Sequence, residues 1–156
     1  MINTMKTIVV FYSRTNNTKL VANIISKMLK CDIEEIIDTR NREGFFGYIR
    51  AGYESTFKKL TVIKKTKYNS SKYDLVIIGT PVWAGLSSPV RTYLSKNKNL
   101  KKVAFFCTMG GSGDKRTFRQ MEGLSKKPLA TLTLTERELK TVDYQNKIKT
   151  FVDTIN

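Results

Sequence analysis

The sequence predicts an α/β fold in which a parallel, doubly wound, five-stranded sheet carries helices on both faces. Two observations support this prediction: short apolar, β-branched runs recur along the chain, and segments with helical spacing of apolar residues separate them. Regular alternation of strand and helix is typical of parallel sheets with right-handed crossovers. With 156 residues and no linker or internal repeat, the chain is expected to form one domain spanning 1–156.

The first predicted strand is Lys6–Tyr12, a nearly continuous apolar run that is typical of a strand buried on both faces. Polar turn residues follow from Ser13 to Asn17. Apolar residues then recur at helical spacing as far as Leu29, which predicts the first helix. A short second strand is predicted at Asp32–Ile37, so the chain begins with the unit strand, helix, strand.

The second predicted helix spans Gly44–Leu60 and is unusually aromatic. We expect its apolar side to pack in the core; the alternative is that this side walls a substrate pocket. The lysine-rich stretch that follows, as far as Tyr68, is interpreted as a solvated loop leading back to the sheet. The apolar side of this helix consists of Phe46, Ile49, Tyr53, Phe57 and Leu60.

The second half of the chain repeats the alternation. Tyr73–Thr80 is the strongest strand pattern, so we expect it at the centre of the sheet. A loop to Ser88 follows, and Pro89 opens a third helix, because the fixed φ of proline suits a first helical turn. The remaining predicted elements are a strand at Lys102–Cys107, a glycine-rich loop at Thr108–Gly113, a helix at Asp114–Leu124, a strand at Pro128–Leu134 and a final helix from Tyr144 to Ile155.

The composition excludes several classes of protein. The absence of histidine removes serine–histidine and cysteine–histidine hydrolases and histidine-ligated metals. Cys31 and Cys107 do not have the spacing of a zinc motif, and we expect both to be reduced and packed. No apolar run approaches the ~20 residues of a membrane span. No signal architecture precedes the first strand, so a cytoplasmic protein starting at Met1 or Met5 is expected.

The charge favours acidic partners. Lysine and arginine number 28 against 13 acidic residues, which gives a net charge of +15. Part of the excess lies in blocks, Lys58–Lys72 and Lys96–Lys102, and we interpret such blocks as solvated faces or loops.

Three loops follow the carboxyl ends of strands, where an open α/β sheet binds its ligands. The first loop, Ser13–Thr18, offers hydroxyl, amide and backbone N–H groups at a helix start, which suits a phosphate or simply caps the helix. The second loop, Thr80–Ser88, holds the only tryptophan, which either contacts a flat ligand or seals the core. The third loop, Thr108–Asp114, has three glycines, so its backbone can approach a ligand closely.

Several known motifs are absent from these loops. The first loop lacks the Gly-Lys-Ser/Thr ending of a nucleoside-triphosphatase. The third loop has Arg116 where a dinucleotide fingerprint needs its last glycine. Cys107 is not a tyrosine-phosphatase nucleophile, because Gly113 stands where that family has its arginine, and we interpret Cys107 as a small buried residue.

Together the three loops resemble those of the short-chain flavodoxin and flavodoxin-like FMN-binding proteins. The resemblance rests on SRTNNT at Ser13–Thr18, GTPVWAGLSSPVRTYL at Gly79–Leu94 and CTMGGSGDK at Cys107–Lys115, and it extends in order and spacing from Lys6 to Ile155. It implies a sheet of strand order 2-1-3-4-5 and FMN as cofactor. It also implies a redox protein that carries electrons between protein partners, with no catalytic side chain and no metal.

By this resemblance the first loop holds the FMN phosphate, Trp83 stacks on the isoalloxazine and the third loop faces its other side. Two departures stand out. Asn16 replaces the usual glycine, although asparagine tolerates the left-handed conformation. The third loop lacks the second stacking aromatic residue, with Met109 as the nearest substitute. The implied FMN-binding residues are Ser13, Arg14, Thr15, Asn16, Asn17, Thr18, Thr80, Pro81, Val82, Trp83, Ala84, Gly85, Thr108, Met109, Gly110, Gly111 and Gly113.

Two alternative functions stay open at this point. An FMN-dependent NAD(P)H or quinone-type reductase on the same scaffold would use the same loops. Only the positive charge supports a nucleic-acid-binding module, because the sequence contains no recognised nucleic-acid-binding motif. For the electron carrier, the +15 charge predicts acidic redox proteins as partners.

Overall fold

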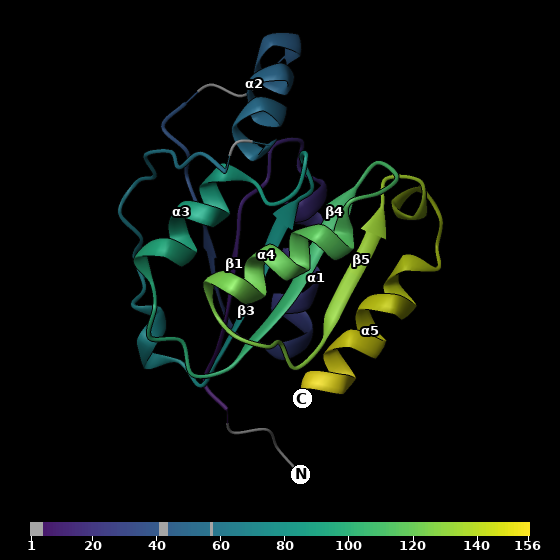
Figure 1. Cartoon of the computed structure of the whole chain (residues 1–156). Coiled ribbons are helices and arrows are strands. Elements are labelled where there is room, and N and C mark those ends of the chain that lie inside the picture. Colours follow the sequence, from purple (N-terminus) through teal and green to yellow (C-terminus); the bar gives the residue numbers. More distant parts are fainter. Residues whose placement is uncertain (1–4, 41–43, 57) are drawn as a thin grey trace.

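The computed structural model describes residues 5–40, 44–56 and 58–156. Five strands form one parallel sheet in the order β2-β1-β3-β4-β5, with β3 at the centre (Figure 1). This confirms the predicted fold class and strand order. The strands are β1 (Thr7–Phe11), β2 (Asp32–Glu35), β3 (Leu75–Pro81), β4 (Val103–Met109) and β5 (Thr131–Thr135).

Helices cover both faces of the sheet. The first and last helices pack on one face and share a core with Val9 and Ile77, whereas the third and fourth pack on the other face with Val76 and Phe105. Two short 3-10 helices, Ser70–Lys72 and Glu138–Lys140, lie in the connections. The α-helices are α1 (Asn17–Leu29), α2 (Gly44–Thr56), α3 (Ser88–Lys96), α4 (Asp114–Leu124) and α5 (Tyr144–Ile155).

Some element boundaries differ from the prediction. The strands β3 and β4 extend to Pro81 and Met109, so part of the second and third loops is strand. The strand β5 begins only at Thr131, although the Leu129 N–H already donates to Val103 O at 2.8 Å. The helix α3 begins at Ser88, which places Pro89 within the first turn instead of at its start.

The prediction that the apolar side of the second helix packs in the core is wrong. Phe46 is 85% exposed, Ile49 51% and Tyr53 56%, and Leu60 lies beyond the end of the helix and is also exposed. Phe57 lies outside the described residues. In Figure 1 α2 stands above the carboxyl ends of the strands and does not lie on a face of the sheet.

An extended segment, residues 61–64, here called the strap, runs antiparallel to the chain that follows β2. Thr39 N–H donates to Val62 O at 3.1 Å, and Lys64 N–H donates to Ile37 O at 2.9 Å. These bonds direct Ile63 into the core formed on the α3 and α4 side of the sheet. The lysine-rich stretch is therefore only partly a solvated loop, since Ile63 belongs to the core. The helix α2 does not fill this part of the core and lies instead at the carboxyl edge of the sheet.

Close contact between β3 and β4 requires glycine at position 79. A Cβ atom on Gly79 would lie 2.0 Å from Cζ of the fully buried Phe106 on the neighbouring strand. No substituent fits in that space without displacing the ring. The tight packing fixes the ends of both strands, from which the second and third loops start.

The cysteines are both free thiols, as predicted. Burial raises the pKa of the Cys107 thiol to about 12 and that of the half-buried Cys31 to about 11. Cys107 is packed inside the sheet, which confirms its interpretation as a small buried residue. Across the described ranges, no helix is both long enough and apolar enough to span a membrane.

Candidate functional site

The first loop (13–18) turns sharply from β1 into α1. Asn16 has a φ of 72°, the left-handed conformation that its asparagine side chain was predicted to tolerate. The Ser13 hydroxyl accepts a hydrogen bond from the Lys19 N–H at 3.2 Å, whereas the Asn16 side chain caps no N–H of the helix. Helix capping therefore accounts for Ser13. The start of α1 carries no acidic residue in its first turn, so its positive end remains suited to an anion.

Thr18 joins the first loop to the third. Its hydroxyl lies 2.7 Å from the hydroxyl of Thr108 at the end of β4, and the two residues are only 1% and 4% exposed. This buried bond engages the Thr18 side chain with the protein itself. In contrast, Thr15 is exposed on the same loop, so its hydroxyl is the more accessible one for a ligand.

The second loop (80–88) places Trp83 at the carboxyl edge of the sheet, where other parts of the protein hold its ring in position. The Trp83 ring packs edge-on against Tyr12 with centroids 5.9 Å apart, and it also contacts the core on the α3 side. Its backbone N–H donates to Gly85 O at 3.0 Å, and the Val82 N–H donates to Thr108 O at 2.9 Å. Sealing the core and facing a ligand are thus compatible roles for this tryptophan.

Hydrogen bonds inside the second loop fix its shape. The hydroxyls of Thr80 and Ser87 lie 2.8 Å apart and are fully buried. Gly85 has a φ of 140°, and a Cβ atom there would lie 2.7 Å from Gln120 Oε1, which accepts the Leu86 N–H at 2.8 Å. The positive φ therefore favours glycine at position 85, and a larger residue there would also displace the end of the Gln120 side chain.

The third loop (108–114) leaves open space at its tip. Gly110 and Gly111 are exposed and have no neighbouring atoms that a Cβ would meet. Gly113 directly precedes α4 and has a φ of 106°. A Cβ atom there would lie 2.8 Å from Cγ1 of Val82. The loop thus offers backbone and Met109 to a ligand, but no aromatic ring.

A single cavity of about 640 Å³ connects the three loops at the carboxyl edge of the sheet. This volume is in the range of small-molecule sites. Most of the predicted site residues line it, namely Arg14, Thr15, Asn17, Pro81, Val82, Trp83, Ala84, Thr108, Met109, Gly110 and Gly111. The others shape the loops without lining the cavity, and they are Ser13, Asn16, Thr18, Thr80, Gly85 and Gly113.

Sequence reasoning missed part of the cavity wall. Glu136 and Ser112 line it, and Glu136 comes directly after β5 at the same sheet edge, a position that the strand prediction already indicated. The largest omission is α2. Its aromatic composition was the available signal, and a pocket wall was the alternative to core packing. The residues of α2 that line the cavity are Tyr48, Ile49, Ala51, Gly52 and Tyr53.

Known structures resemble this chain at low sequence identity. No protein-family model matches the sequence, and no curated protein matches it either. A putative flavoprotein from Bacteroides eggerthii shares 22% identity and a TM-score of 0.75, covering 97% of this chain and 98% of the other. A flavoprotein from Lactobacillus acidophilus, crystallised in complex with FMN, shares 21% identity and a TM-score of 0.70, covering 91% and 99%.

A flavodoxin from Megasphaera elsdenii, whose two-electron reduced form was solved in solution, is more distant. It shares 19% identity and a TM-score of 0.55, with 94% of this chain and 97% of the other covered. The coverage of whole chains in both directions shows that the similarity extends to the complete fold. Together with the strand order 2-1-3-4-5, these likenesses establish that the chain has the flavodoxin-like fold.

Proposed function

We propose that this chain is an FMN-binding redox protein that carries electrons to and from a protein partner. The observation that carries the proposal is the cavity itself, which joins the positive end of α1 to the tryptophan loop on a flavodoxin-like sheet. FMN has the same two parts in the same order, a phosphate and a flat ring. The Lactobacillus acidophilus neighbour, which was crystallised with FMN, supports this assignment.

The residues at the helix end fit the phosphate. The backbone N–H groups at the start of α1 and the hydroxyl of Thr15 would hold the phosphate, with the Arg14 guanidinium on the same cavity wall. Hydrogen bonds to a charged group are worth about 1.5–3 kcal/mol each, so the phosphate would supply much of the affinity.

The second loop fits the ring. Trp83 offers a flat apolar face, and its backing by Tyr12 fixes the indole before any ligand arrives. The Gly85 carbonyl accepts the backbone N–H of Trp83, and Gly85 does not line the cavity, whereas Ala84 does; we therefore assign the Ala84 carbonyl as the acceptor for a ring N–H. When bound, FMN supplies the electron chemistry, so the chain needs no general acid or base, in keeping with its lack of histidine.

The charge supports a protein as electron partner. At low salt, a net charge of +15 speeds the association of proteins with acidic surfaces and slows their dissociation. The reductase alternative uses the same FMN site and differs in its reductant. Steady oxidation of NAD(P)H by the FMN-loaded protein, without a protein partner, would identify a reductase and exclude a pure carrier.

Comparison of FMN with riboflavin tests the site assignment, because riboflavin has the ring and no phosphate. We expect the wild-type protein to bind FMN far more tightly. Thr15→Ala should weaken FMN by about 1–3 kcal/mol while leaving riboflavin affinity unchanged. Equal affinity of the wild type for both flavins would contradict a phosphate site at the first loop.

A further inference from the structure

The helix α2 exposes apolar side chains beside the ligand cavity. Ile49 and Tyr53 are half exposed, yet both line the same cavity as Thr15 and Trp83. Exposed apolar clusters at a cavity mark binding sites more often than they mark accidents of packing. The arrangement indicates that these side chains become covered when the cavity is filled.

One end of this wall is tied to the first loop. The guanidinium carbon of Arg14 lies 5.6 Å from the centroid of the Tyr48 ring, within the range of a cation–π contact. Arg14 belongs to the loop that precedes α1, and Tyr48 lies in the first half of α2. The contact therefore holds the first half of α2 beside the proposed phosphate site.

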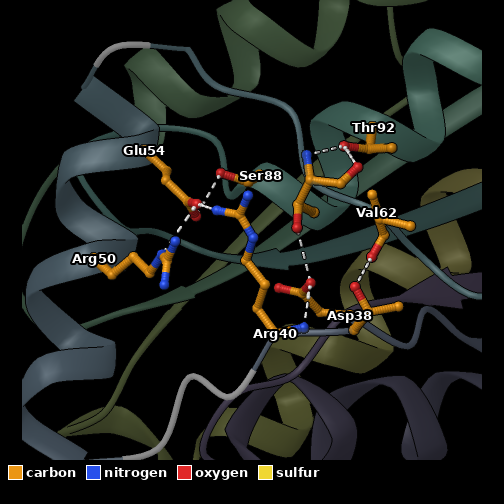
Figure 2. A network of polar contacts seen from close by, with 9 residues as sticks. Asp38, Arg40, Arg50, Glu54, Val62, Ser88 and Thr92 are labelled. Carbon is orange, nitrogen blue, oxygen red and sulfur yellow. Dashed lines mark hydrogen bonds and ion pairs between the residues drawn. The ribbon is translucent and has the colours of Figure 1, made fainter.

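The other end is tied to the second loop and α3. The Ser55 hydroxyl donates to Leu86 O at 3.0 Å in a buried bond. Glu54, only 3% exposed, forms ion pairs with Arg40 and, at 3.7 Å, with Arg50. Its other oxygen lies 3.4 Å from the Ser88 hydroxyl at the start of α3. Figure 2 shows these side chains converging on the Glu54 carboxylate from α2, α3 and the chain before α2.

Between these two contact points, α2 lines the cavity on which the third loop presents few side chains. Gly110 and Gly111 present no side chain, and Met109 is the only long apolar residue of that loop. A flat ring lying on Trp83 would therefore have no aromatic contact from the third loop. The anchored stretch of α2 adds the apolar side chains of Ile49 and Tyr53 to the lining of this cavity.

We propose that α2 is the second wall of the flavin site, with Ile49 and Tyr53 packing against the isoalloxazine of FMN. These two side chains take the part of the stacking residue that the third loop lacks. The inference rests on the proposed function, since it needs FMN in the cavity. It adds a binding role for a helix outside the three strand-end loops.

The test compares variants of the same helix. Ile49→Ala/Tyr53→Ala removes both wall residues, and alanine preserves helix propensity. Phe46→Ala is the matched control, because Phe46 is 85% exposed on α2 and does not line the cavity. Far-UV circular dichroism and urea unfolding of each apoprotein confirm that the variants fold.

The readouts are the FMN dissociation constant, from fluorescence titration, and the FMN release rate, from stopped flow. We expect the double variant to bind FMN about ten-fold more weakly, equivalent to about 1.4 kcal/mol, mainly through faster release. Phe46→Ala should match the wild type. Wild-type affinity and release rate in the double variant would overturn the inference while leaving the proposed function intact. Failure of the wild type itself to bind FMN would overturn both.

Discussion

The buried bond between Thr18 and Thr108 predicts strong energetic coupling between the first and third loops. The two hydroxyls are 2.7 Å apart and nearly inaccessible to water. Thr18→Val keeps the shape of the side chain but leaves the Thr108 hydroxyl without its partner. An orphaned buried hydroxyl costs about 1–3 kcal/mol, whereas replacing both partners with isosteric apolar groups is nearly neutral.

The assay is urea unfolding of the apoprotein in a double-mutant cycle of Thr18→Val and Thr108→Val. Each single variant should lower the free energy of unfolding by about 2 kcal/mol, which at an m-value of about 2 kcal/mol/M moves the midpoint by about 1 M. The double variant should lie close to the wild type. Thr131→Val, at an exposed position on β5, controls for the change in strand propensity that Thr108→Val makes in β4. A double variant that loses the sum of the two single effects would refute the reasoning.

Three further predictions concern other parts of the molecule. Arg91→Met should raise the free energy of unfolding by about 1 kcal/mol or more, because Arg91 is only 6% exposed and its Nε and Nη2 have no hydrogen-bond partner among the described residues. Burial, and after it repulsion from Arg116, lowers the pKa of Arg91, which shows that its charge is poorly stabilised there. A thermal melt showing marked destabilisation of the variant would contradict this prediction. Cys107, with a pKa near 12, should resist iodoacetamide at pH 8, where about one thiol in ten thousand is ionised, and react faster as pH rises; rapid labelling of the native protein, located by mass spectrometry, would show otherwise. The midpoint potential of bound FMN should become more negative as salt is raised, because screening weakens the pull of the +15 charge on the reduced flavin; a redox titration showing no salt dependence would contradict this.

Much of the fold could be predicted because its three central strands, β1, β3 and β4, are buried on both faces. The apolar runs around Val9 and Ile77 are long enough to identify central parallel strands, and the loops after them are then placed at one edge. The left-handed Asn16 was also predictable, because a tight strand-to-helix turn needs a residue that tolerates positive φ. These features depend on local sequence, which is why the pattern was sufficient.

The position of α2 could not be predicted in the same way. Helical spacing of Phe46, Ile49 and Tyr53 indicates an apolar side but does not say whether that side meets the sheet or a ligand cavity. The position of α2 depends on Ile63, which fills the core near β2 in place of a side chain from α2. Ile63 lies in a lysine-rich segment that has little apolar pattern of its own. The position of α2 also depends on the Glu54 carboxylate, whose partners come from distant parts of the chain.

The most direct test of FMN binding uses the single tryptophan. Since Trp83 is the only tryptophan and lines the cavity, the protein's tryptophan emission reports this site alone. Titration of the apoprotein with FMN should quench that emission to a plateau at one FMN per chain, together with a bound flavin absorption spectrum. Tryptophan emission that does not change at saturating FMN, or no uptake of FMN at all, would contradict the account.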